Sequence, residues 1–374
     1  MTMFRVKGNF WAGVILLLVA VSCVDRINFD VGNAGVFPVV VEGFISDEPG
    51  PYEIRVTRSF DVESKLSIKT PLSVKKMQIS DNAGTVEDLV KIQDGIYRTH
   101  ENGIQGTVGR AYKIHIELLD GRIYESIPDT LLPTGAVEKV YTEFATQKQQ
   151  SGETNHWFNV YFDAKSGDSK SNQFLWKMVG TYQVDTNPEL YTEPCGQGHC
   201  SLPLPCSSYI VGTDGELRYV KPCECCSCWV NIYNDIPIVS NDQIVANGRF
   251  SRIEAGQIPF NQWTMMFKVH VEIQQYSVSP RVFDYWKSIK QQKQATTSLF
   301  QPLTGKVVGN FKQLSGAEQK LEGIFYASSI RKNASFLSRA DVPKGITIPT
   351  QDLPFTDSCL KFANSTTIQP NYWN

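Results

Sequence analysis

The sequence lacks a large net charge of either sign. Its 36 lysine and arginine residues nearly balance its 38 aspartate and glutamate residues, which leaves a formal net charge of −2. Such a chain has no overall field that would attract a polyanion or a polycation. The basic residues are scattered and no nucleic-acid-binding motif occurs, so we expect no nucleic acid partner.

A recognisable catalytic signature is also missing. The five histidines are dispersed and none belongs to a His-Glu-x-x-His motif. The sequence has no Gly-x-Ser-x-Gly elbow, no phosphate-binding glycine loop and no compelling pair of carboxylates. We therefore predict that the protein is not an enzyme and has no catalytic residues, metal or cofactor. A hydrolase stays an alternative, because a glycosidase needs only two acids that a sequence does not reveal.

Only one apolar run is long, and it lies at the N-terminus. Arg5 and Lys7 precede an apolar run from Phe10 to Val21, which is followed by Ser22 and Cys23. The run is shorter than the roughly 20 residues of a membrane-spanning helix, and this layout is typical of an export signal. The segment 19–23 resembles a bacterial lipobox. We predict a signal peptide over residues 1–22, lipidation of Cys23 and a tether over residues 23–36, with an ordinary secretory signal as the alternative.

The length of 374 residues exceeds what one hydrophobic core usually holds. A hydrophobic content of 41% against 20% charged residues supports packed cores. We therefore predict two domains, over residues 37–135 and 136–374, and a mainly β fold.

The first domain is predicted to be an Ig-like β-sandwich. Tyr52 to Thr57 alternate strictly between apolar and polar residues, as in a strand with one buried face. Seven such runs occur in about 100 residues, a spacing typical of a small sandwich. The runs are Val39 to Ile45, Tyr52 to Phe60, Val74 to Ser80, Val86 to Ile92, Ile96 to Arg98, Tyr112 to Leu118 and Ile123 to Ser126.

The second domain is predicted to be β-rich with one clear helix over residues 280–293 and a cysteine-rich insertion over residues 193–228. Pro280 suits the first helical position, and Val282, Trp286 and Ile289 share one helical face. Late strands are expected at Val307 to Phe311 and Ile324 to Ile330.

Apart from Cys23 the sequence contains eight cysteines, an even number that favours four disulfides in an exported protein. The candidates are Cys195, Cys200, Cys206, Cys223, Cys225, Cys226, Cys228 and Cys359. Eight cysteines allow 105 connectivities. Adjacent Cys225 and Cys226 are expected to reach different partners, and Cys359 to tie the C-terminal segment to the cluster. The alternative is a zinc site that uses Cys195, His199 or Cys200 with Cys223 and Cys226, although this spacing is too compact for a common zinc knuckle.

Nearly the whole mature chain resembles a family of Bacteroidota lipoproteins of unknown function, domain of unknown function 4249 (DUF4249). The resemblance is carried by the order and spacing of several short segments: Val39 to Ile45, the Gly109 to Tyr124 hairpin, Phe174 to Trp176, Cys226 to Trp229, Phe283 to Trp286, Gly309-Asn310 and Gly323 to Ser328. It implies an outer-membrane location and genes that often neighbour those of TonB-dependent receptors. It supplies no catalytic residues.

These observations together predict a non-enzymatic, lipid-anchored outer-membrane protein that serves a TonB-dependent transporter or a related envelope complex. The alternative is a surface glycan-binding protein or hydrolase. Surface export signals usually place several acidic residues directly after the lipidated cysteine, and here only Asp25 is present. The sequence therefore does not indicate which side of the outer membrane the protein faces, nor does it identify the ligand or the barrel.

Overall fold

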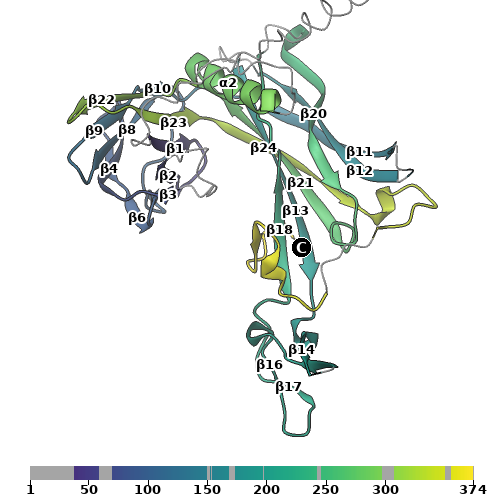
Figure 1. The fold of residues 1–374 in the computed structure, drawn as a ribbon. Coiled ribbons are helices and arrows are strands. Elements are labelled where there is room, and N and C mark those ends of the chain that lie inside the picture. Colours follow the sequence, from purple (N-terminus) through teal and green to yellow (C-terminus); the bar gives the residue numbers. More distant parts are fainter. Residues whose placement is uncertain are drawn as a thin grey trace, which may run out of the picture.

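The computed structural model describes residues 38–58, 70–149, 152, 154–167, 173–196, 198–241, 246–296, 307–349 and 355–373. The predicted signal peptide, the lipidation site Cys23 and the tether lie outside the described residues. Among those described, no helix is long and apolar enough to cross a membrane. The fold is mainly β, as predicted. Figure 1 shows a sandwich beside a second β-rich body, from which a narrow extension projects.

Twelve strands build the sandwich. They are β1 (Val39–Ser46), β2 (Glu53–Arg58), β3 (Thr70–Pro71), β4 (Val74–Asp81), β5 (Val86–Asp88), β6 (Val90–Gln93), β7 (Ile96–Arg98), β8 (Ala111–Leu118), β9 (Ile123–Ser126), β10 (Asp129–Thr130), β22 (Phe311–Ser315) and β23 (Leu321–Ser328). One sheet has the order β23-β1-β2-β7-β6 with β3 beside β2, and the other has the order β22-β9-β8-β4-β5 with β10 beside β8. Alternate residues of β8 are buried, because one face of the strand packs on the core between the sheets.

The predicted run from Val86 to Ile92 is two strands rather than one. Strand β5 pairs with β4 in one sheet, whereas β6 pairs with β7 in the other. Between them the Leu89 N–H donates to the Met77 carbonyl oxygen at 2.9 Å. The chain therefore changes sheets at Leu89, which a continuous alternating pattern does not reveal.

Strand β23 completes the sandwich from far downstream. It lies parallel to β1 along all eight residues, from Val39 opposite Leu321 to Ser46 opposite Ser328. Gly323 has a φ of +99°, and a Cβ atom there would lie 2.0 Å from the Val41 carbonyl oxygen, so only glycine fits. The division predicted at 135/136 assigned β22 and β23 to the second domain. The structure places both in the sandwich sheets, because they cover edges that the first 135 residues leave open.

The second body contains two further sheets. Its main strands are β11 (Ala136–Lys148), β12 (Thr154–Lys165), β13 (Gln173–Asp185), β18 (Ser227–Tyr233), β19 (Ile238–Asn241), β20 (Arg249–Pro259), β21 (Lys268–Ser277), β24 (Ile330–Ser338) and β25 (Ser365–Thr366), with 3₁₀ turns η4 (Ala246–Gly248), η5 (Arg339–Asp341) and η6 (Cys359–Lys361). One sheet has the order β11-β12-β20, and the other has the order β24-β21-β13-β18-β25 with β19 beside β13. Their facing sides share an aromatic core that includes Phe162, Trp176 and Phe250.

A third cluster of buried residues joins the two bodies beneath helix α2 (Pro280–Thr296). The helix contributes Val282, Trp286 and Ile289, the face predicted from the sequence. Strand β23 supplies Ile324 and Tyr326 to this cluster, while its alternate residues face the sandwich core. The predicted run from Ile324 to Ile330 therefore spans two strands, and the chain passes from the first body to the second at Ser329.

Candidate functional site

The extension comprises residues 186–226 and is inserted between β13 and β18, which are neighbours in one sheet. It contains the 3₁₀ turns η1 (Pro188–Leu190) and η2 (Pro205–Ser207) and two hairpins. The first hairpin joins β14 (Thr192–Cys195) to β15 (Gly198–Ser201), and the second joins β16 (Tyr209–Val211) to β17 (Leu217–Tyr219). In Figure 1 these elements project beyond the end of β13 and β18, away from both bodies.

Four disulfides link all eight of the predicted cysteines. Cys195 bonds to Cys200 within the first hairpin, Cys206 to Cys225 across the extension, Cys223 to Cys226 at its base, and Cys228 to Cys359 beyond it. Adjacent Cys225 and Cys226 have different partners, as predicted. The last disulfide ties the C-terminal segment to the start of β18.

Backbone hydrogen bonds at the base fix the direction in which the extension leaves the sheet. The Thr186 N–H donates to the Cys226 carbonyl oxygen at 2.8 Å, and the Cys359 N–H donates to the Cys225 carbonyl oxygen at 3.1 Å. The side chains of Cys225, Cys228 and Cys359 are fully buried. Three chain segments, at Thr186, Cys225-Cys226 and Cys359, therefore meet at the base. The buried cysteines there belong to the Cys206–Cys225 and Cys228–Cys359 disulfides.

Beyond this base the extension has almost no apolar interior. Its described residues contribute to none of the three hydrophobic clusters of the molecule. Gly, Pro, Ser and Cys make up 18 of its 41 residues. Disulfides and backbone hydrogen bonds, rather than a hydrophobic core, therefore stabilise the extension.

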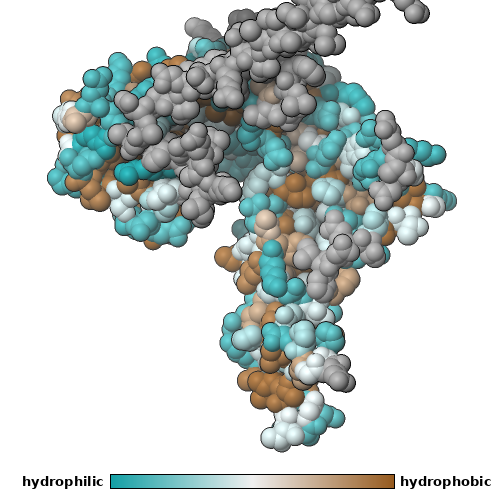
Figure 2. All heavy atoms as spheres, viewed as in Figure 1, coloured by the Kyte–Doolittle hydropathy of each residue, from teal (hydrophilic) through white to brown (hydrophobic). Residues whose placement is uncertain are grey.

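The tip of the extension exposes apolar side chains instead of burying them. In the β16–β17 hairpin, Ile210 is 56% exposed and Tyr219 is 59% exposed, and Val211 and Val220 are exposed as well. The rings of Tyr209 and Tyr219 meet edge to face with their centroids 5.5 Å apart. Figure 2 shows apolar surface gathered near the end of the extension. We call Ile210, Val211, Tyr219 and Val220 the tip patch.

Charged side chains border the tip patch in pairs of opposite sign. Arg218 donates to the Asp214 carboxylate at 2.5 Å, and Lys221 pairs with Glu224. Hydrogen bonds from the Glu216 backbone and from Arg218 lower the pKa of Asp214. An apolar centre with a paired polar border is the usual composition of a protein-binding surface.

The same region contains the residues considered for zinc. Cys195, Cys200, Cys223 and Cys226 form two disulfides, so in this pairing none of them is a thiolate that can bind a metal. His199 lies exposed on β15. Within the described ranges, no group of three or more His, Cys, Asp or Glu residues could hold a metal ion.

The remaining histidines lie outside the extension. His100 Nδ1 lies 2.8 Å from Glu87, His156 Nδ1 lies 3.0 Å from the Thr146 hydroxyl, and His115 lies 3.9 Å from Glu125. His270 stacks on Tyr372 with ring centroids 3.9 Å apart, and burial lowers its pKa. Each histidine thus has a local structural partner.

The sequence interpretation missed the tip patch, although a signal for it exists. Tyr209 to Val211 and Leu217 to Val220 are short β-prone runs separated by Gly212-Thr213-Asp214-Gly215-Glu216, which is typical of a hairpin. The Gly212 N–H donates to the Glu216 carbonyl oxygen at 2.8 Å and closes the turn. The hairpin could be predicted from these residues, but its position away from both bodies could not.

Comparison with known proteins gives one assignment. No curated protein was found to match the chain. The family model described as "Domain of unknown function (DUF4249)" matches residues 24–334. This match covers most of the chain, including the sandwich, the whole extension and all of the second body up to the middle of β24, so the chain belongs to the DUF4249 family.

Proposed function

We propose that this protein is an exported, lipid-anchored outer-membrane protein without enzymatic activity, which binds a TonB-dependent transporter or a related envelope complex. The observation that carries the proposal is the disulfide-braced extension, which exposes apolar side chains at its tip and adds nothing to the core. An exposed apolar patch far from the body is unfavourable in water unless a partner covers it.

Three further observations support this proposal. The lipobox-like segment ending in Cys23 indicates a lipid anchor, and disulfides are typical of exported proteins. An anchor confines the protein to a membrane surface and raises its effective concentration beside other envelope proteins. The barrel is proposed by analogy with the resembled family, whose genes often neighbour those of TonB-dependent receptors.

The tip patch alone is too small for a stable interface. Specific complexes bury about 800 Å² on each partner. Two more exposed apolar side chains, Leu190 and Leu202, lie on the same extension. We expect a contact with the tip patch at its centre and the first hairpin at its border.

Cross-linking followed by affinity purification from native membranes tests this contact. The wild-type protein should enrich a TonB-dependent barrel over an unrelated lipoprotein. The double substitution Ile210→Asp, Tyr219→Asp should lower that enrichment at least tenfold, because it places charges at the centre of the interface. Leu119→Asp is the control, because Leu119 is 70% exposed on the sandwich, far along the chain. Equal recovery with both variants, or recovery of the lipoprotein alone, would reject the proposed contact.

The anchor has a separate test. Mass spectrometry of the mature protein should find a lipid on Cys23 as the new N-terminus. Cys23→Ser should abolish both processing at this site and membrane association. Unchanged membrane association and processing would contradict the lipoprotein part of the proposal and leave the tip patch unaffected.

A further inference from the structure

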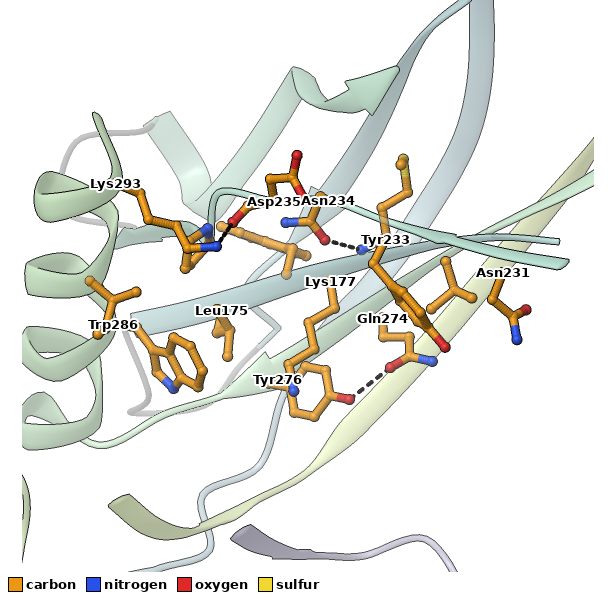
Figure 3. A pocket seen from close by; sticks show the side chains of 15 residues that line it. Leu175, Lys177, Asn231, Tyr233, Asn234, Asp235, Gln274, Tyr276, Trp286 and Lys293 are labelled. Atoms are coloured by element: carbon orange, nitrogen blue, oxygen red, sulfur yellow. Dashed lines mark hydrogen bonds between the residues drawn. The ribbon is translucent and has the colours of Figure 1, made fainter. Parts of the chain in front are cut away.

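A cavity of about 530 Å³ lies on the face of the β13 sheet that helix α2 covers. Strands β13, β18 and β21 form its floor, and the helix forms one wall. Figure 3 shows Lys177, Tyr276 and Trp286 close together at one side, with Lys293 at the other. Its volume lies within the range of small-molecule sites, roughly 300 to 1,000 Å³.

Lys177 reaches this cavity from the middle of β13. Its ammonium lies 4.7 Å from the ring centroid of Tyr276, 5.2 Å from that of Phe44 and 5.9 Å from that of Trp286. The three rings come from β21, β1 and α2, so both bodies surround this one charge. Lys177 and Trp286 also line a smaller adjoining cavity of about 300 Å³.

The ammonium of Lys177 has aromatic faces around it but no oxygen partner. No hydrogen bond or ion pair to Lys177 occurs within the described parts of the chain. Two neighbouring donors, the Trp286 Nε1–H and the Tyr326 hydroxyl, are buried and also have no acceptor among the described residues. Buried donors are normally satisfied. The region around Lys177 is therefore short of acceptors.

The charges around the larger cavity favour an anion. Lys177 and Lys293 line it together with one carboxylate, Asp235, and the Lys293 ammonium donates to the Asp235 carbonyl oxygen at 2.6 Å. In the smaller cavity Glu42 lies near enough to favour the charged form of Lys177, although burial has the larger effect and lowers the pKa of Lys177 to about 8. The larger cavity is thus the side from which an anion would approach.

We propose that the larger cavity binds a small organic carboxylate, whose carboxylate pairs with the ammonium of Lys177 and whose flat face lies against Tyr276 and Trp286. The half-buried ammonium of Lys177 matches one negative charge, as a carboxylate carries. The amides of Asn231, Asn234 and Gln274 line the same cavity and can bind polar groups on the rest of the ligand. Gln274 accepts from the Tyr276 hydroxyl at 2.7 Å, which fixes the ring beside Lys177.

This site does not depend on the partner contact, because it lies between the β13 sheet and helix α2 and not on the extension. Isothermal titration calorimetry of the full-length protein in detergent tests it with two matched pairs of probes, benzoate against benzamide and D-glucuronate against D-glucose. At least one carboxylate should bind at least tenfold more tightly than its neutral counterpart. The pair that shows the difference identifies an aromatic or a sugar-like body.

Lys177→Met should reduce the affinity for that carboxylate at least tenfold, because a charge-assisted hydrogen bond is lost. Lys139→Met is the matched control, since Lys139 lies 4.9 Å from the ring centroid of Tyr141 outside the cavity. Circular dichroism confirms that both variants are folded. The proposal is overturned if neither carboxylate binds more tightly than its neutral counterpart, or if Lys177→Met binds the carboxylate as the wild type does.

Discussion

The sandwich packs Ile54, Ile79 and Tyr112 into a closed core and has no cysteine in residues 38–135, whereas the extension has six cysteines in residues 186–226 and no core. The sandwich gains stability from apolar area removed from water, at about 25 cal/mol per Å². The disulfides stabilise the extension mainly because they reduce the conformational entropy of its unfolded state. Its apolar side chains are consequently available to remain on the surface, and this difference is the physical basis for assigning it a binding role.

We expect the largest effect from removing a disulfide. The Cys228–Cys359 disulfide closes a separation of 131 residues, for which chain entropy gives a stabilisation of about 5 kcal/mol. The double substitution Cys228→Ala, Cys359→Ala should lower the free energy of unfolding by about that amount, measured by chemical denaturation. Hydrogen exchange should increase first in residues 355–373, because β25 pairs with β18 through only two residue pairs.

Reduction of the wild-type protein serves as the control for this variant. A reductant should loosen the extension and residues 355–373 but leave hydrogen exchange in β8 unchanged, since the sandwich contains no disulfide. If the double variant unfolded at the wild-type denaturant concentration, the C-terminal segment would be held by packing alone. The contacts of Trp263 with Phe355 and Phe362, at 4.7 and 5.1 Å between centroids, would then be the sufficient cause.

We expect the next largest effect from truncating a buried side chain in the core of the sandwich. Phe325 is fully buried in β23, the strand that closes the sandwich from far along the chain. Phe325→Ala should lower the free energy of unfolding by about 3 to 5 kcal/mol, as large-to-small substitutions of buried aromatic residues do. Denaturant unfolding followed by far-UV circular dichroism measures this loss.

Leu119→Ala is the matched control for Phe325→Ala, because Leu119 is exposed on the same sandwich. It should change the free energy of unfolding by about 0.5 kcal/mol or less. A similarly small loss for Phe325→Ala would mean that β23 is not part of the cooperative unit formed by the sandwich.

The sequence predicts the parts of the molecule whose signals are local. The alternation in Tyr112 to Leu118 predicts β8, Pro280 and the apolar face predict α2, and the even cysteine count predicts four disulfides. Contacts across long separations leave weaker signals. Nothing near Leu321 indicates that β23 will pair with β1, although the steric need for Gly323 becomes clear once the pairing is known.

The cavity around Lys177 likewise depends on contacts between residues far apart in the sequence, which the sequence alone does not predict. A lysine within the apolar run from Phe174 to Val184 is visible in the sequence, and its neighbours on the same face of β13 are Leu175 and Val179. The sequence does not show that Phe44 of the sandwich and Trp286 of α2 will cover that face. The unpaired charge is therefore a property of the assembled fold.

The smallest expected effect concerns this junction between the two bodies and is a gain in stability. Burial lowers the pKa of Lys177 from 10.5 to about 8, and each unit of pKa corresponds to about 1.4 kcal/mol. Burying the charge thus costs about 3 kcal/mol at pH 7, and the surrounding rings offset about 1 to 2 kcal/mol of it. Lys177→Met should therefore raise the free energy of unfolding at pH 7 by about 1 to 2 kcal/mol, measured by chemical denaturation.

The gain should depend on pH in a defined direction. Because the folded pKa of Lys177 lies below the unfolded one, the unfolded chain holds an extra proton between about pH 8 and 10.5, and wild-type stability rises across this window. The advantage of Lys177→Met should be complete below pH 8 and lost by about pH 10.5. Burial raises the pKa values of three nearby tyrosines, which therefore stay neutral in the folded protein between about pH 8 and 10.5; these are Tyr276, Tyr285 and Tyr326. The other charged groups that line the two cavities are Glu42, Glu53, Arg55, Asp235 and Lys293. Lys139→Met should show no such dependence, and a pH-independent gain for Lys177→Met would mean that the methionine packs better and that the charge of Lys177 costs nothing.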